Sequence, residues 1–61
     1  MEYTVHFQRG TRVGARSLRM VTVEADDAAA AIKLAKREFS DRTYKLTRVD
    51  YFDADGHLQI A

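Results

Sequence analysis

One segment of this chain has the composition and spacing of a helix, and it limits what the rest can fold into. Residues 28 to 39 consist largely of alanine, lysine, leucine and arginine, which are good helix formers. An aspartate just before the segment, Asp26 or Asp27, is expected to cap its first amides and to suit the helix dipole. The apolar residues of the segment recur at helical spacing and form one stripe: Ala28, Ala31, Ile32, Ala35 and Phe39. This single amphipathic helix needs strands to pack against.

The two segments before the helix have the alternating pattern of strands. Residues 2 to 8 place Tyr3, Val5 and Phe7 on one face and polar residues on the other. Residues 18 to 25 indicate a second strand. The connection between them contains two glycines and little pattern, which is typical of a loop.

Two further strands are expected after the helix. Residues 44 to 53 predict a third strand whose apolar positions change phase, and a bulge near Thr47 or Arg48 would accommodate that change. Asp55 and Gly56 are typical of a tight turn, with Gly56 at a positive φ. A short fourth strand, residues 57 to 60, follows the turn.

The order of these elements predicts one α+β domain over residues 1 to 61. The length of 61 residues leaves room for a single domain with a small core. Because the helix reverses the chain after the second strand, the third strand pairs best with the first. We expect a ββαββ fold with a four-stranded antiparallel sheet in the order 2-1-3-4. The helix covers one face of the sheet and leaves the other uncovered. The expected core is Tyr3, Val5, Phe7, Val21, Val23, Ala28, Ala31, Ile32, Ala35, Phe39 and Leu46.

Composition narrows the class of protein further. The chain has no cysteine, so neither a disulfide framework nor a thiolate metal site is expected. No apolar run approaches the roughly 18 residues that span a bilayer, and the first residues lack the pattern of a secretory signal. We therefore expect a cytoplasmic protein with no membrane association.

The residues that could carry chemistry favour a structural interpretation. Asp53 and Asp55, with Asp50 nearby, suggest calcium only weakly, because an EF-hand loop starting at Asp53 would lack its glycine and its last ligand. His6 and His57 are too few for a stable zinc site, and both are expected at the surface. The sequence contains no nucleophile elbow and no phosphate-binding glycine loop. We expect no metal, no cofactor and no enzymatic activity.

Positive charge gathers in two places although the net charge is only +1. Four arginines lie between residues 9 and 19 without a local acid, and the helical segment adds three basic residues. Arginine pairs in bidentate fashion with carboxylates and phosphates. A contact surface for an anionic partner is therefore expected at Arg12, Arg16, Lys33, Arg37 and the apolar Leu34. Alternatively, the arginines only keep the domain soluble, and Leu34 only covers the sheet edge.

Two classes of function fit these features. One is a protein-interaction module that binds a protein or a protein–nucleic-acid complex with an anionic surface. The other is a small nucleic-acid-binding domain that uses the arginine-rich loop, with direct contacts to phosphates. Self-association as a homodimer is also expected, because Leu18 and Met20, with part of the third strand, would form an apolar patch on the uncovered sheet.

The pattern of motifs also resembles a known class of proteins. Val23-Glu24-Ala25-Asp26, the helix with Ile32-Lys33-Leu34-Ala35 and the hairpin at Asp55-Gly56 are similar in order to those of very small phage and mobile-element proteins, including a type I-F anti-CRISPR protein. The resemblance covers most of the chain, and no functional residue is carried over from it. It implies a compact inhibitor that binds a bacterial CRISPR surveillance complex and blocks its target DNA.

Overall fold

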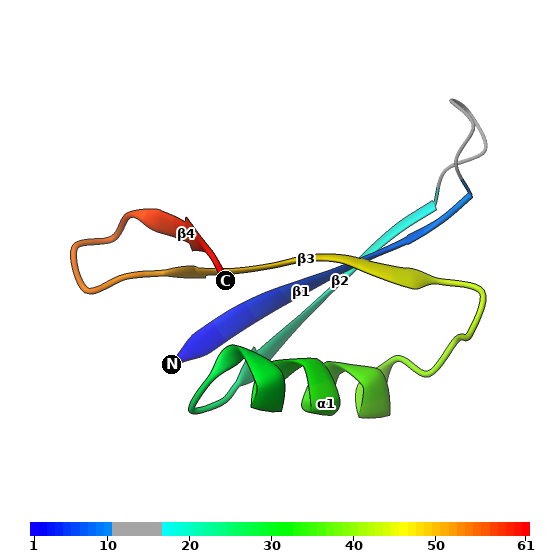
Figure 1. The fold of residues 1–61 in the computed structure, drawn as a ribbon, viewed down its shortest axis with the longest axis horizontal. Coiled ribbons are helices and arrows are strands. Elements are labelled where there is room, and N and C mark those ends of the chain that lie inside the picture. The colour runs from blue at the N-terminus through cyan, green and yellow to red at the C-terminus, as the bar shows by residue number, and fades with distance from the viewer. Residues whose placement is uncertain (11–16) are drawn as a thin grey trace.

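The computed structural model describes residues 1–10 and 17–61, which form a ββαββ fold (Figure 1). The four strands form one antiparallel sheet in the order β2-β1-β3-β4. The fold class and the strand order expected from the sequence are therefore confirmed. The bounds of the elements are β1 Glu2–Arg9, β2 Ser17–Glu24, α1 Ala28–Glu38, β3 Lys45–Phe52 and β4 Leu58–Ile60.

The helix begins and ends where the local sequence predicts. Asp27, rather than Asp26, is the N-cap residue, and its Oδ1 accepts a hydrogen bond from the backbone N–H of Ala30 at 2.8 Å. Phe39 ends the helix in an extended conformation, with its N–H still bonded to the carbonyl of Ala35 at 2.8 Å. Lys36 and Arg37 lie in the last turn, where positive charge suits the helix dipole.

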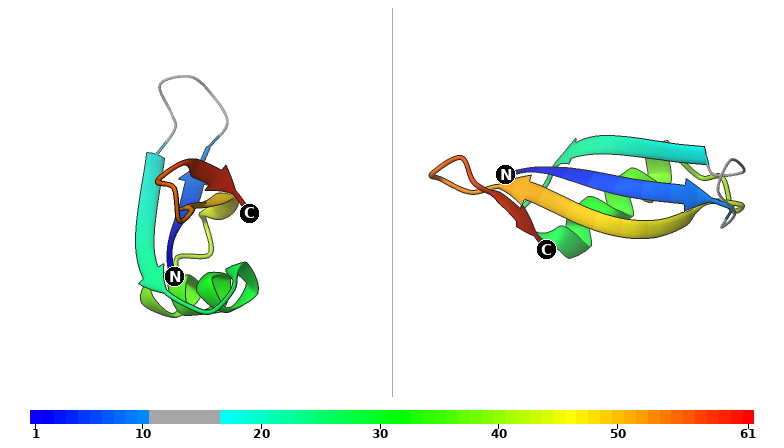
Figure 2. Two further views of the ribbon diagram at one scale, coloured as in Figure 1. Left: turned by 90° about the vertical axis from the view of Figure 1, so that its left-hand side faces the viewer. Right: turned by 90° about the horizontal axis from the view of Figure 1, so that it is seen from above.

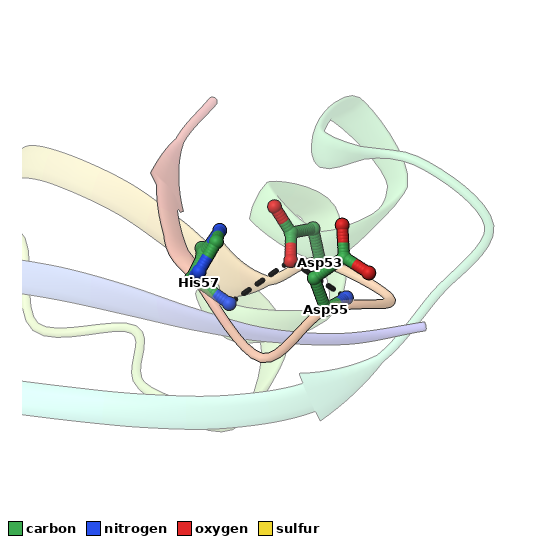
Figure 3. A group of neighbouring side chains, drawn as sticks. All are labelled: Asp53, Asp55 and His57. Carbon is green, nitrogen blue, oxygen red and sulfur yellow. Dashed lines mark hydrogen bonds between the residues drawn. The ribbon is translucent and has the colours of Figure 1, made fainter.

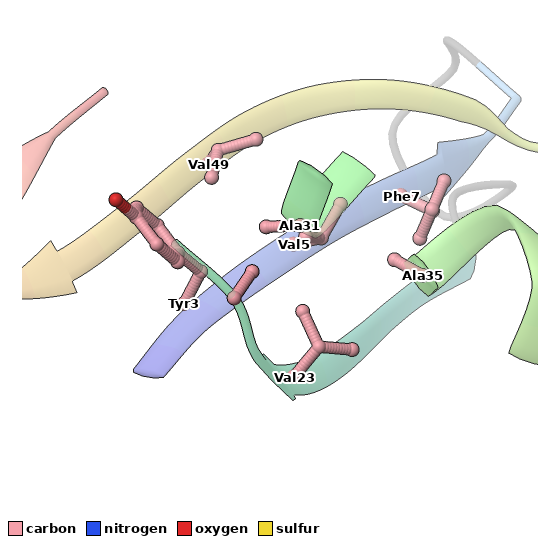
Figure 4. Close-up of a cluster of buried hydrophobic side chains, with 8 residues drawn as sticks. Tyr3, Val5, Phe7, Val23, Ala31, Ala35 and Val49 are labelled. Carbon is pink, nitrogen blue, oxygen red and sulfur yellow. The ribbon is translucent and has the colours of Figure 1, made fainter. Parts of the chain in front are cut away.

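The molecule has two layers, with α1 packed on one face of the sheet (Figures 1 and 2). Small residues of the helix allow this close approach, since Ala31 and Ala35 are fully buried against the strands (Figure 4). Val5 on the central strand is also fully buried. The buried apolar core consists of Tyr3, Val5, Phe7, Val23, Ala25, Ala31, Ala35 and Val49.

The outer parts of the expected core are only partly buried. Val21, Ala28, Ile32, Phe39 and Leu46 pack against the core without entering it. Phe39 joins an aromatic row instead. Its ring centre lies 5.3 Å from that of Phe7 and 4.9 Å from that of Tyr44. A two-layer domain this small has few fully enclosed positions, so these outer residues stay partly buried. The expected set omitted Val49 and Ala25, which belong to the core; Val49 lies opposite Val5 on the central strand.

The bulge expected near Thr47 or Arg48 is present in β3. His6 of β1 lies opposite Arg48, whereas the next residue, Phe7, lies opposite Leu46, so Thr47 is the extra residue. The hydroxyl of Thr47 donates to the carbonyl of His6 at 3.3 Å. The bulge brings Leu46 and Val49 to the same side of the sheet, and it turns Arg48 and Asp50 to the other side.

No helix within residues 1–10 and 17–61 has the length and apolar character needed to cross a membrane.

Candidate functional site

The face of the sheet opposite α1 is not covered by any described residue, and we call it the open face (Figure 2, right). The register places its side chains in rows that cross the strands. One row joins Met20, His6 and Arg48, and the next joins Thr22, Thr4, Asp50 and Ile60. Phe52 and Leu58 pair at the far end.

Large apolar side chains are exposed on the open face. Met20 is 68% exposed, Phe52 66% and Ile60 70%, and Leu18 and Leu58 are more than half exposed. Single exposed apolar residues are ordinary on protein surfaces, but several on one face mark an interaction surface. Leu18 and Met20 are thus exposed as expected, and a second exposed group lies on β3 and β4.

A buried charge lies in the centre of the open face. Asp50 is only 5% exposed, and its Oδ2 contacts Nε2 of His6 at 2.9 Å and Nε of Arg48 at 3.0 Å. Because a carboxylate only accepts hydrogen bonds, His6 Nε2 must carry the hydrogen and donate it. Nη2 of Arg48 lies 3.5 Å from the same histidine nitrogen. The charge of Asp50 is thus compensated within the chain, as a buried charge requires.

This cluster refines the interpretation of two residues. Asp50 is near Asp53 and Asp55 in the sequence, but it lies inside β3 and is buried. His6 lies on the polar face of β1 as expected, but its side chain is 18% exposed and bonded to Asp50. Residues 44 positions apart along the chain make this contact, so no local pattern could reveal it.

The hairpin between β3 and β4 is a tight turn organised by Asp53 (Figure 3). Its Oδ1 accepts from the backbone N–H groups of Asp55 and His57, both at 2.9 Å, and its Oδ2 accepts from Nε2 of Gln59 at 2.9 Å. Gly56 adopts a φ of 81°, the positive value expected at this turn. His57 is exposed, as the sequence indicated.

Possible ligand atoms for a metal come together in this turn. Those of Asp53, Asp55 and His57 lie within 4.8 Å of one another. Both oxygens of Asp53 are already hydrogen-bond acceptors within the turn. The backbone N–H of His57, followed by the side chain of Gln59, holds the pKa of Asp53 below its ordinary value of 3.8. The turn's own hydrogen bonds account for this cluster, so we assign it a structural role.

The expected partner-binding residues fall on the other side of the molecule. Lys33 and Arg37 are exposed on α1, one turn apart, and Leu34 beside them is 36% exposed. This outer surface of α1 faces away from the sheet, so the open face and the basic helix surface are opposite sides of the domain (Figure 2, left). Arg12 and Arg16 lie outside the described residues.

The apolar residues of the hairpin were missing from the expected site. Leu58 and Ile60 are in phase in the sequence, but only the pairing of Phe52 with Leu58 and of Asp50 with Ile60 puts them on the open face. The sequence did contain one signal for this placement. The alternation of apolar residues changes phase at Thr47, and this change puts Phe52 on the face away from the core.

Comparison with known proteins found no matching family model, no matching curated protein and no matching solved structure.

Proposed function

We propose that this chain is a non-enzymatic protein-binding module. The observation that carries the proposal is the open face, where exposed apolar side chains of three strands lie on both sides of a compensated ionic cluster. Apolar area around a satisfied polar centre suits a protein partner better than a phosphate backbone, which would select for cations. The open face contributes only one described arginine, Arg48, and that side chain is paired with Asp50.

A binding role also agrees with the use of the titratable side chains. Asp50 is buried and bonded to His6 and Arg48, and both oxygens of Asp53 serve the hairpin turn. Neither carboxylate is therefore placed to reach a substrate proton, as general acid–base catalysis requires.

The resemblance to small phage proteins supports a narrower proposal, that the partner is a bacterial CRISPR surveillance complex in the cytoplasm. Such a complex presents an anionic surface, and the basic helix surface of Lys33, Leu34 and Arg37 is complementary to it in charge. Arg12 and Arg16 would add to this contact.

The direct test uses a purified type I-F surveillance complex and its labelled target duplex. We expect the chain to reduce DNA binding by the complex. The double variant Lys33→Glu with Arg37→Glu should lose at least about tenfold in potency, which corresponds to about 1.4 kcal/mol. The variant Arg12→Glu with Arg16→Glu tests the loop in the same assay. Unaltered DNA binding at saturating protein would remove the narrower proposal.

The wider proposal is tested by affinity capture from a bacterial lysate, with and without nuclease. A protein partner should remain bound after nuclease treatment, and the Met20→Lys and helix variants identify the surface that holds it. The competing nucleic-acid function predicts loss of the captured material with nuclease. It also predicts direct binding to a short DNA whose affinity falls steeply as salt rises. That result would overturn the protein-binding proposal.

A further inference from the structure

The apolar side chains of the open face form two separate groups at opposite corners. Leu18 and Met20, the β2 group, lie on one outer strand at the level of Gln8 and His6. Phe52, Leu58 and Ile60, the hairpin group, lie on the other outer strand pair. Tyr3 pairs with Tyr51, so Phe52 lies at the level of Glu2, the first residue of β1, far from the β2 group. The polar cluster of His6, Arg48 and Asp50 separates the two groups.

This arrangement is complementary to itself. A twofold axis through the polar cluster would place the β2 group of one copy against the hairpin group of the other, and the same contact would occur twice. Sheets pack face to face in this way at about 10 Å, with apolar side chains between them. The cluster at the axis makes its hydrogen bonds within its own chain, so the partner need not supply any.

The accessible surface of the chain is larger than expected for a monomer of its mass, as it would be if a second subunit normally covered part of it. The chain has an accessible surface of 4746 Å² at a mass of 7.0 kDa. A folded monomer of this mass is expected to expose roughly 4000 Å². The excess of about 700 Å² is close to the roughly 800 Å² that each partner buries in a standard interface.

Charge does not oppose such an association. The net charge is +1, so two copies repel each other only weakly. Arg48, the exposed cation near the proposed axis, is paired with Asp50 in its own chain.

We propose that the partner on the open face is a second copy of this chain, related by a twofold axis near His6 and Asp50. The inference rests on the proposed function, because it identifies the occupant of the face proposed to bind protein. In this dimer the basic helix surfaces point outward on both sides and stay accessible to a further partner.

Sedimentation of the full chain measures the association. We expect the wild type to approach twice the mass of one chain at high micromolar concentration. Met20→Lys and Phe52→Glu each place a charge in both copies of the contact, and each should weaken the dimer by at least about tenfold. Leu34→Lys is the matched control, because it puts the same charge on the opposite side of the molecule and should leave the dimer intact.

Mixing the Met20→Lys and Phe52→Glu variants tests the geometry itself. In a mixed dimer the lysine introduced into the β2 group of one copy faces the glutamate introduced into the hairpin group of the other. The second contact keeps both wild-type groups, so association should recover when the variants are combined. The side chains of Met20, Phe52 and Leu34 are all exposed. Circular dichroism verifies that each variant is folded. Leu18→Lys and Leu58→Glu replace the first pair if either variant fails to fold.

Two results overturn the inference. One is a wild type that remains monomeric at high micromolar concentration, and the other is a dimer that both single variants leave intact. If the wild type is monomeric and captures a protein that Met20→Lys no longer captures, the dimer is rejected and the proposed function is retained. If the dimer is confirmed but captures no other protein and inhibits no complex, the dimer is retained and binding to a further partner is rejected.

Discussion

At the scale of single residues, Asp50 is a position where a small substitution should lower the free energy of unfolding. Its carboxylate is buried beside the Arg48 guanidinium and the His6 ring, which are themselves partly exposed. Asp50→Ala removes the acceptor for both, and water can solvate His6 and Arg48 only in part. We expect the free energy of unfolding to fall by about 1–3 kcal/mol, measured by urea denaturation.

Asp55→Ala is the matched control for this change. Asp55 is an exposed aspartate whose side chain accepts no hydrogen bond from another described residue, so the expected change is within about 0.5 kcal/mol. Equal losses in the two variants would show that the ionic cluster contributes nothing particular to stability.

At the scale of elements, the β3–β4 hairpin should respond to acid through Asp53. The hydrogen bonds from the turn lower the pKa of this carboxyl below 3.8, so its contribution to stability is present above about pH 4. That contribution is lost as the pH falls through the lowered value in the folded state. Asp53→Asn should therefore be less stable than wild type near neutral pH and should lose less stability on acidification.

Unfolding free energies measured between about pH 2 and pH 6 test this difference, and NMR titration reports the carboxyl directly. Asp41 must be considered in the same range, because the side chain and backbone of Thr43 lower its pKa as well. Comparing Asp53→Asn with wild type isolates the contribution of Asp53, because Asp41 is present in both proteins. Parallel stability curves for wild type and Asp53→Asn would contradict the role given to Asp53.

The docking of α1 on the sheet can be tested with two phenylalanines. Phe39 contacts the rings of Phe7 and Tyr44 at the end of the helix, whereas Phe52 lies on the open face. Because Phe39 is only partly buried, Phe39→Ala should cost about 3 kcal/mol, the lower end of the range for such changes. Phe52→Ala should change the stability of the monomer by less than about 1 kcal/mol. Thermal unfolding at low protein concentration measures both changes. Similar losses of stability in the two variants would contradict the packing of α1 on the sheet through Phe39.

The elements differ in how far sequence alone could specify them. The alanine stripe, the cap at Asp27 and the turn at Gly56 are local features, and each was predicted close to its observed position. Strand order followed from direction, because the helix must reverse the chain before β3 begins. The phase change in β3 also predicted the bulge at Thr47.

The candidate site was less predictable for a physical reason. Its features depend on which residues of distant strands lie opposite one another. Asp50 is buried by His6 and Arg48 only once β1 and β3 pair in their shifted register. Ile60 reaches the open face only through its pairing with Asp50. Charge clustering along the chain instead pointed to the basic helix surface, which is exposed but lies on the opposite side.

At the scale of the whole molecule, the domain is thin and its stability should depend on its own concentration. A chain of 61 residues buries only about 60% of the surface that its unfolded form exposes, so a second copy on the open face adds a large share of the total. Dimer unfolding then releases two chains, and mass action favours the folded dimer as concentration rises. Above the dissociation constant, each tenfold increase in concentration should raise the melting temperature by about 3–5 °C.

Scanning calorimetry across two decades of concentration measures this slope. The Leu34→Lys variant should follow the wild type, because its altered side chain lies on the helix surface away from the proposed interface. Met20→Lys should reach the same slope only at concentrations at least about tenfold higher, because a charge at the β2 group weakens both symmetric contacts at once. A wild type whose melting temperature stays constant over the whole range would mean that one sheet and one helix provide all the stability of this fold.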